Sequence, residues 1–224
     1  MTSGSTFPQR LTKIDELIRP DHSYLTPDDL CYFLGEYSAR KGYAFSPTNN
    51  LVLNFKKPVS KRGRPEWPYK ERAITNAADA FRTALNVEWL NQATLVPIPP
   101  SKAKTDPFYD DRLLRMLRAI RPSPALDIRE LIVQAQSTSA AHEQVDRPRP
   151  EDILARYHVD ARLSAPMPSM IGLIDDVLTT GAHFKAGQAV LRAVFPHIRI
   201  IGLFIARRLP EAADMEDFLD LDEI

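Results

Sequence analysis

Two adjacent carboxylates, Asp175 and Asp176, follow an apolar run at 171–174. Two more apolar residues lead into the turn 179–182, Thr-Thr-Gly-Ala, and an amphipathic segment then opens at His183. This order predicts a buried strand whose carboxyl end brings two acids to a crevice, followed by a helix. Paired carboxylates can accept hydrogen bonds from two vicinal hydroxyls. The N–H groups and hydroxyls of the turn, with the partial positive charge of a helix N-terminus, suit a phosphate. A sugar phosphate offers both groups.

A less specific interpretation of the same residues stays open. Asp and Thr are ordinary at strand ends and at helix N-caps, so any α/β protein can place them there. The complete order of apolar strand, Asp-Asp, two apolar residues, Thr-Thr-Gly and helix is much more specific than the acid pair alone.

A second candidate anion site follows the strand predicted at 94–97. Pro99 and Pro100 stop this strand, and Ser101, Lys102 and Lys104 come directly after them. A turn stiffened by prolines next to a serine and two lysines can bind a highly charged anion through backbone amides and point charges. The alternative is a plain turn with solvated lysines.

The segment 171–183 resembles the 5-phosphoribosyl-1-diphosphate (PRPP) signature of the type I phosphoribosyltransferases. Leu95-Val96-Pro97-Ile98-Pro99 with Ser101-Lys102 resembles the ComF-like branch of that family. Further similarity lies in Leu53-Asn54-Phe55-Lys56, in the polar stretch beginning Gln136-Ser137, and in Ala155-Arg156-Tyr157-His158-Val159. The likeness extends over about residues 51–209. PRPP carries a 5-phosphate and a 1-pyrophosphate, so two anion sites beside a diol-binding acid pair match its shape.

The resemblance implies a role for each matching residue. It implies Mg²⁺ carried by PRPP rather than a metal site of the protein's own, and a polar loop at 134–149 that excludes water. The implied residues are Asp175 and Asp176 for catalysis, Thr179, Thr180, Gly181, Ala182 and His183 for the 5-phosphate, Ser101, Lys102 and Lys104 for pyrophosphate, and Gln136, Arg147 and Arg149 in the loop.

The sequence departs from the family pattern at two positions. His183 replaces the usual Ser or Thr, and it could donate a ring N–H to phosphate, more strongly if protonated, or its bulk could narrow the site. Gly172 replaces a bulkier apolar residue, which predicts looser packing. The loop also has few basic residues, Arg147 and Arg149.

Three functions follow from these observations. The first is an enzyme that transfers the phosphoribosyl group of PRPP to an acceptor, or releases it, with loss of pyrophosphate. The second is a catalytically weak PRPP or nucleotide sensor that signals to a protein partner. The third is an accessory role with nucleic acid, since ComF-like proteins are associated with DNA uptake and the segment 56–72 is locally basic.

Amino-acid composition limits the cellular compartments and the classes of partner that we expect for this chain. The 224 residues include 29 Lys and Arg against 29 Asp and Glu, so the overall charge favours neither nucleic acid nor membrane. Cys31 is the single cysteine, which excludes an intrachain disulfide and fits a reducing compartment. No apolar stretch has the length of a membrane span. We therefore expect a cytoplasmic protein. The resemblance implies a small-molecule phosphoribosyl substrate, and the oligomeric state stays open.

The expected architecture is an α/β phosphoribosyltransferase core with a parallel sheet and helices on both faces. Alternating strands and helices support this fold class. We expect a small N-terminal hood at 1–90, the core at 91–209 and an acidic tail at 210–224. The predicted helices are 11–18, 27–41, 70–86, 110–120 and 183–194, with a helical turn or two near 151–157, and the predicted strands are 51–55, 94–97, 157–159, the strand entering Asp175, and 198–205.

Overall fold

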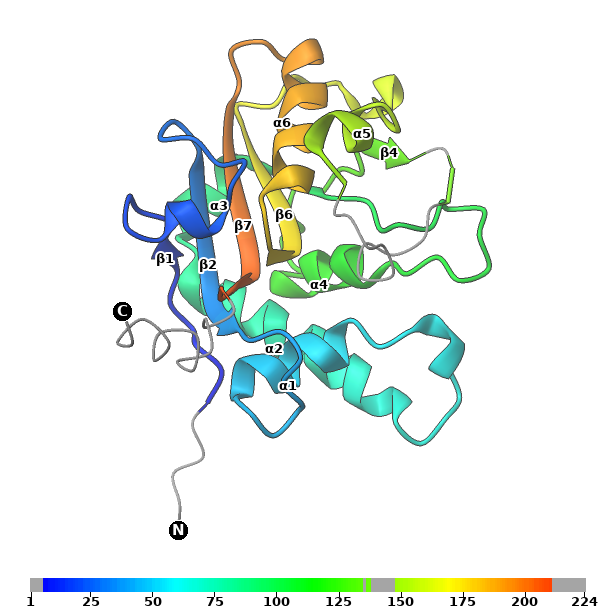
Figure 1. The fold of residues 1–224 in the computed structure, drawn as a ribbon. Coiled ribbons are helices and arrows are strands. Elements are labelled where there is room, and N and C mark those ends of the chain that lie inside the picture. The colour runs from blue at the N-terminus through cyan, green and yellow to red at the C-terminus, as the bar shows by residue number, and fades with distance from the viewer. Residues whose placement is uncertain (1–5, 135, 138–147, 211–224) are drawn as a thin grey trace, which may run out of the picture.

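A mostly parallel five-stranded sheet forms the centre of the protein (Figure 1). The computed structural model describes residues 6–134, 136–137 and 148–210. The strand order is β1-β2-β7-β6-β3, in which β1 is antiparallel to β2 and the other pairs are parallel. The strands are β1 (Thr12–Lys13), β2 (Leu30–Tyr37), β3 (Ala93–Pro97), β6 (Met170–Leu178) and β7 (Arg199–Arg208). The predicted α/β class with a parallel sheet is confirmed.

Helices cover both faces of this sheet, because successive strand residues point to opposite sides. Leu95, Ile174 and Leu203 join one core cluster, while their neighbours Val96, Leu173 and Phe204 join another. The first cluster packs against α1 (Pro47–Phe55), α2 (Trp67–Ala84), α3 (Val87–Gln92) and α4 (Arg112–Ile120). The second packs against α6 (Ala182–Val194) and α5 (Pro150–Leu154).

A second, small sheet lies beside α6. It consists of β4 (Ile132–Gln134) and β5 (Tyr157–Val159), which are antiparallel. Both strands contact α6, and α5 packs on it as well. This confirms the strand predicted at 157–159 and the short helix that precedes it. The acidic segment 211–224 lies outside the described residues.

Three predicted elements in the first quarter of the chain are wrong. Residues 27–41 contain the strand β2 rather than a helix, because Phe33 and Leu34 are both buried, on opposite faces of the sheet, and apolar residues on both faces imitate helical spacing. The predicted helix 11–18 is instead the short strand β1 followed by a turn in which Asp15 accepts the N–H groups of Leu17 and Ile18.

The predicted strand 51–55 is the end of helix α1. The start signal precedes it: the Ser46 hydroxyl accepts the N–H of Asn49 at 3.0 Å, and Pro47 occupies the first turn. The predicted strands 94–97 and 198–205 and the predicted helices 70–86, 110–120 and 183–194 are confirmed, with ends that differ by a few residues. The strand β2 from the predicted hood segment 1–90 thus lies inside the central sheet, between β1 and β7.

None of the helices in residues 6–134, 136–137 and 148–210 combines the length and the apolar composition needed to cross a bilayer.

Candidate functional site

The two acids of the signature line a cavity at the carboxyl end of β6. β3 pairs with β6 as far as Ile174, where the N–H of Ile98 donates to the Ile174 carbonyl at 2.8 Å. β6 continues beside β7 to Leu178, so Asp175 and Asp176 lie past the end of β3. A cavity of about 1310 Å³ opens here. Parallel sheets commonly bind ligands in such a crevice at the carboxyl ends of their strands.

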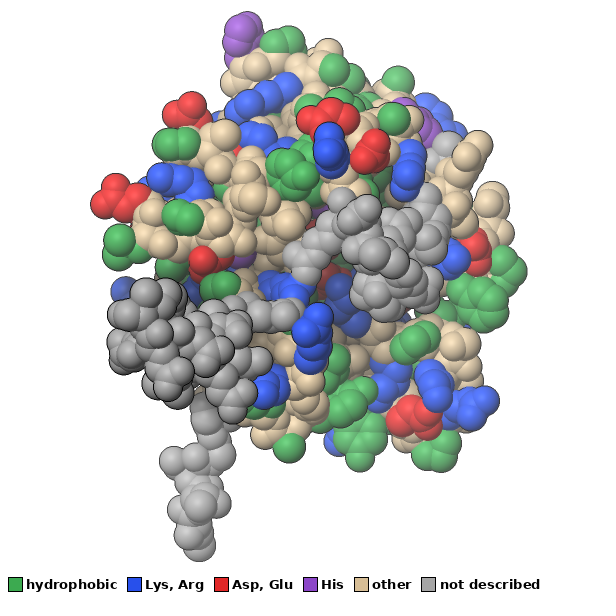
Figure 2. All heavy atoms as spheres, viewed as in Figure 1, with side chains coloured by type: hydrophobic (Ala, Val, Ile, Leu, Met, Phe, Trp, Pro, Cys, Tyr) green, Lys and Arg blue, Asp and Glu red, His purple; other side chains and the backbone are tan. Residues whose placement is uncertain are grey.

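The two predicted anion motifs lie in the walls of the same cavity, although they are far apart in the chain. The predicted site residues that line it are Ser101, Lys102, Lys104, Asp175, Asp176, Thr179, Thr180, Ala182 and His183. Gly181, Gln136 and Arg149 are not among the described lining residues, and Arg147 lies outside the described part of the chain. Figure 2 shows Lys and Arg side chains near the centre of this face, between the part that holds α6 and the part that holds α1 and α2.

The Thr179-Thr180-Gly181-Ala182 turn is supported from behind by the N-terminal segment 22–25. His22 Nδ1 bonds to the carbonyl of Thr179, and the N–H of Tyr24 donates to the carbonyl of Thr180 at 2.9 Å. Gly181 has a φ of 87°, and a Cβ there would lie 2.9 Å from Leu25, so the turn requires glycine. Helix α6 begins at once, at Ala182, and its N-terminus favours an anion at this end of the cavity.

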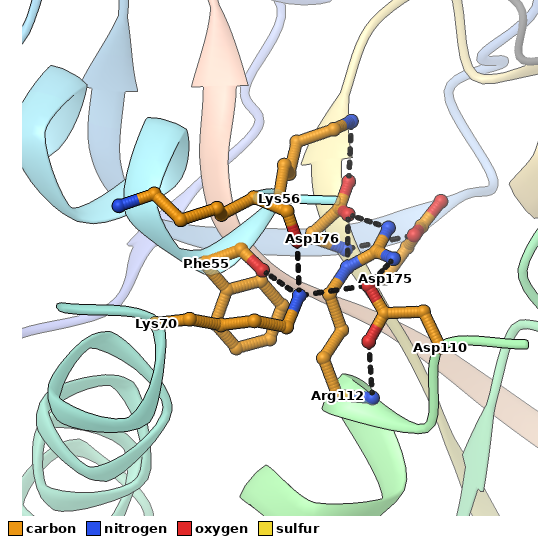
Figure 3. A network of polar contacts seen from close by, with 8 residues as sticks. Phe55, Lys56, Lys70, Asp110, Arg112, Asp175 and Asp176 are labelled. Atoms are coloured by element: carbon orange, nitrogen blue, oxygen red, sulfur yellow. Dashed lines mark hydrogen bonds and ion pairs between the residues drawn. The ribbon is translucent and has the colours of Figure 1, made fainter. Parts of the chain in front are cut away.

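Asp176 is held by two cations (Figure 3). Its Oδ2 accepts from Arg112 Nη2 at 2.6 Å and from Arg112 Nε at 3.2 Å, and its Oδ1 accepts from Lys56 Nζ at 3.2 Å. Burial alone would raise the pKa of this carboxyl, but the charges of Lys56 and Arg112 hold the pKa well below its usual range. Asp176 is therefore ionised and fixed in place.

Asp175 has a different electrostatic state. Burial, and next the charge of Asp176, raise the pKa of Asp175 to about 7, although its Oδ1 accepts the N–H of Asp176 at 2.7 Å. Near neutral pH this carboxyl can therefore donate or accept a proton. Two neighbouring acids with separated pKa values can perform different roles toward one diol.

His183 faces the same cavity as a neutral ring. Its Nδ1 is 2.9 Å from the hydroxyl of Tyr157, on β5, and the residue is half-buried. Burial lowers the pKa of His183 to about 4, so the protonated ring considered from the sequence is not the state of the ligand-free protein at neutral pH. The neutral ring can still donate one N–H.

Gly172 does not loosen the packing, which corrects the expectation from the sequence. A Cβ at this position would lie 2.8 Å from the Trp89 ring and 3.0 Å from Leu95. The indole of Trp89 thus fills the space that a larger residue at 172 would occupy.

The second anion element, at 101–104, is less tightly held. Lys104 Nζ pairs with Glu130 at 2.9 Å, and its side chain is 51% exposed. Two side chains at the start of the predicted loop hold the backbone of this turn. Gln134 Nε2 donates to the Ser101 carbonyl at 2.8 Å, and Ser137 Oγ accepts the N–H of Ala103 at 3.1 Å. Gln136 contributes its carbonyl to the same Gln134 side chain, at 2.9 Å.

Sequence reasoning missed Arg112, Asp110 and Lys70 as parts of this site. Arg112 also donates to Asp110 at 2.9 Å, and Asp110 accepts from Lys70 at 2.7 Å. An acid followed by an arginine at the start of a predicted helix indicates a helix cap, and no local pattern connects either residue with Asp176. Lys56 was singled out only through the resemblance.

The structure defines the class as an α/β protein with a mostly parallel sheet and a charged cavity at the carboxyl ends of its strands. No protein-family model matches the chain, and no curated protein sequence matches it. The relation to the phosphoribosyltransferases therefore stays a prediction from the motifs.

Proposed function

We propose that the chain binds PRPP with Mg²⁺ and transfers or releases its phosphoribosyl group with loss of pyrophosphate. The observation that carries this proposal is the meeting of three elements around one cavity: the acid pair Asp175 and Asp176, the turn 179–182 at the start of α6, and the lysine-bearing turn 101–104. A diol between two anionic groups would contact all three elements at once.

Each element has one role in the proposed reaction. Asp175 and Asp176 would accept hydrogen bonds from the ribose hydroxyls and offer negative charge to the oxocarbenium character that develops at C1. The turn 179–182 would hold the 5-phosphate, which fixes the position of C1 relative to the acceptor. Ser101, Lys102 and Lys104 would stabilise the departing pyrophosphate.

The residues at the cavity are compatible with Mg²⁺ that arrives on the ligand. Among the residues that the structure describes, no group of three or more His, Cys, Asp or Glu side chains is arranged to hold a metal ion. Mg²⁺ commonly takes one or two carboxylates together with water and substrate phosphates, and Asp175 is the acid not already bound to cations. When bound, the ion would neutralise charge on pyrophosphate.

Calorimetric titration of PRPP with Mg²⁺ tests the proposal. We expect saturable binding to the wild type, loss of that binding in Asp175→Asn/Asp176→Asn, and unchanged binding in Asp28→Asn, a control at an exposed acid outside the cavity. Absence of binding to the folded wild type would refute the proposal.

Turnover then separates the enzyme from the sensor. Pyrophosphate release measured over a panel of nitrogen nucleophiles, and with water alone, would identify a transferase or a hydrolase. Binding without release in every case would favour the sensor, a role consistent with an Asp176 whose charge is already paired with Arg112 and Lys56.

A second candidate function is contact with single-stranded nucleic acid, and the surface around α1 and α2 favours it. Exposed cations lie over exposed aromatic rings there: Arg72 is 4.5 Å from the ring centre of Tyr69, which is 50% exposed, and Lys41 is 5.8 Å from that of Phe45, which is 55% exposed. Aromatic faces and cations together bind single strands without sequence preference. Oligonucleotide binding that falls steeply with salt and is lost in Tyr69→Ala would support this function.

A further inference from the structure

A chain of alternating charges leads from the interior of the protein to Asp176. Lys70, on α2, is bonded to Asp110, which is shared with Arg112, which in turn forms the two-pronged contact with Asp176 (Figure 3). The members come from three places in the sequence: α2, the start of α4 and the end of β6. The chain thus connects Lys70, which does not line the cavity, with the acid that would bind the ribose hydroxyls.

Lys70 is the buried end of this chain. Its side chain is 1% exposed, and it is not among the residues that line the cavity. Its ammonium group donates to the carbonyls of Phe55 and Lys57, at 2.8 and 2.9 Å, and to Asp110 at 2.7 Å, which uses all three of its N–H donors. An amine with three fixed acceptors cannot shift without breaking hydrogen bonds, so it holds Asp110 in one place.

Asp110 transmits that placement to Arg112. Its Oδ2 accepts from both Lys70 and Arg112, and the guanidinium is also 5.8 Å from the ring centre of Phe55. With Nη1 held by Asp110, the planar guanidinium of Arg112 directs Nε and Nη2 to Asp176 Oδ2. Lys56, at the other oxygen of Asp176, is 42% exposed and makes one contact there, so it fixes the acid much less.

We propose that Lys70 is a positioning residue for the ligand site: through Asp110 and Arg112 it sets the orientation of the Asp176 carboxylate. The proposal concerns how the site is built, and its effect on ligand affinity rests on the proposed function. Loss of a buried partner that orients a ligand-binding group typically weakens function by about 10–100-fold.

Helix α2 offers a matched control for this role. Arg82 ties the other end of α2 to α4, with Nε donating to the carbonyl of Ile120 and Nη2 to that of Ala119, both at 2.6 Å. Arg82→Met therefore removes hydrogen bonds between the same two helices but leaves the charge chain intact. If Lys70→Met and Arg82→Met lose similar thermal stability, a difference between their ligand affinities cannot be due to a general loss of stability.

Two readouts test the proposal. We expect Lys70→Met to bind PRPP with Mg²⁺ about tenfold more weakly than the wild type, and Arg82→Met to bind within twofold of it. In ¹⁵N-arginine NMR spectra without ligand, the Arg112 Nε–H signal, assigned by its loss in Arg112→Lys, should be protected from exchange in the wild type and in Arg82→Met and unprotected in Lys70→Met. If Lys70→Met does not fold, Asp110→Asn, which keeps the side-chain shape, should show the same two losses.

The outcomes distinguish this proposal from the proposed function. A wild type that does not bind PRPP overturns the proposed function, while the Arg112 signal still decides whether Lys70 orders the arginine. A protected Arg112 signal in Lys70→Met, or equal loss of affinity in Lys70→Met and Arg82→Met, would overturn the positioning role.

Discussion

The two elements proposed to bind anions, at 179–182 beside the acid pair and at 101–104, differ in how firmly the protein itself holds them. On the acid side, Asp176 is 7% exposed and is held by Arg112 and Lys56, and the neighbouring turn is supported by residues 22–25. On the lysine side, Lys104 is half exposed and has one acidic partner, Glu130. The acid side is thus organised before any ligand binds, while the lysine side presents an exposed cation.

This difference suggests a division of roles between the two sides. Buried, hydrogen-bonded charges define geometry, because removing one partner leaves the other desolvated and unpaired. Exposed lysines contribute long-range electrostatic attraction. Salt weakens this attraction by screening, but small movements of the side chains do not abolish it. We infer that the acid side selects the sugar and that the lysine side attracts the more highly charged pyrophosphate.

The largest expected difference between the two sides is in stability. Arg112→Met should lower the free energy of unfolding by about 3–5 kcal/mol, since it leaves Asp176 and Asp110 buried without their shared cation. Lys104→Met should change it by less than about 1 kcal/mol, because its ion pair is exposed. Urea unfolding of both variants measures this. Equal losses would show that the lysine side is as rigidly built as the acid side.

A second prediction concerns the partner of His183 on the acid side. His183→Ser should destabilise the protein by about 2 kcal/mol, because the Tyr157 hydroxyl loses the hydrogen bond to Nδ1. In the His183→Ser/Tyr157→Phe double variant, part of that loss should be recovered, since the Tyr157 hydroxyl that lost its partner is then absent. Thermal unfolding of both variants and of Tyr157→Phe measures the three losses of stability. If the loss in the double variant equals the sum of the two single losses, His183 and Tyr157 are not energetically coupled.

The third prediction uses the pH dependence of Asp175. Its pKa is about 7 in the folded protein against an ordinary 3.8, so the folded state keeps a proton that the unfolded chain has released. The resulting stabilisation is complete below about pH 4 and is lost as the pH rises through 7. Relative to the wild type, Asp175→Asn should therefore gain about 2–3 kcal/mol of unfolding free energy between pH 5 and pH 8, since one pKa unit corresponds to about 1.4 kcal/mol. A pH-independent difference would contradict the raised pKa.

The smallest expected effect is on the lysine side. Lys102→Ala/Lys104→Ala should weaken PRPP binding about tenfold, or about 1.4 kcal/mol, at low salt, with a smaller effect at high salt. The folded structure should be unchanged, as circular dichroism and thermal unfolding would show. A salt-independent loss would indicate that these lysines also shape the site.

The sequence allowed prediction of those parts of the fold that depend on local pattern. The strand entering Asp175, the Thr-Thr-Gly turn and α6 each have their own signal in consecutive residues. β2 does not, because a strand buried on both faces, with Phe33 and Leu34 in different cores, has no alternating pattern to separate it from a helix. α1 had a start signal in Ser46 and Pro47 that the apolar residues 51–55 obscured.

The site was predictable to the same extent. Both anion motifs were identified because each is contiguous, and the parallel sheet brings their strand ends together. The contacts that determine the ionisation of the two acids could not be predicted, because Arg112 and Lys70 are brought to Asp176 only by the tertiary structure. The raised pKa of Asp175 and the lowered pKa of His183 likewise follow from burial that no local pattern encodes.

Competition between two fragments of PRPP tests the central claim most directly, namely that both elements serve one ligand. Ribose 5-phosphate and pyrophosphate, each with Mg²⁺, would be titrated into the wild type alone and in the presence of PRPP. We expect both fragments to bind weakly and PRPP to displace each of them, because it occupies the acid side and the lysine side together. Binding of either fragment that persists under saturating PRPP, or no binding of PRPP at all, would contradict the claim.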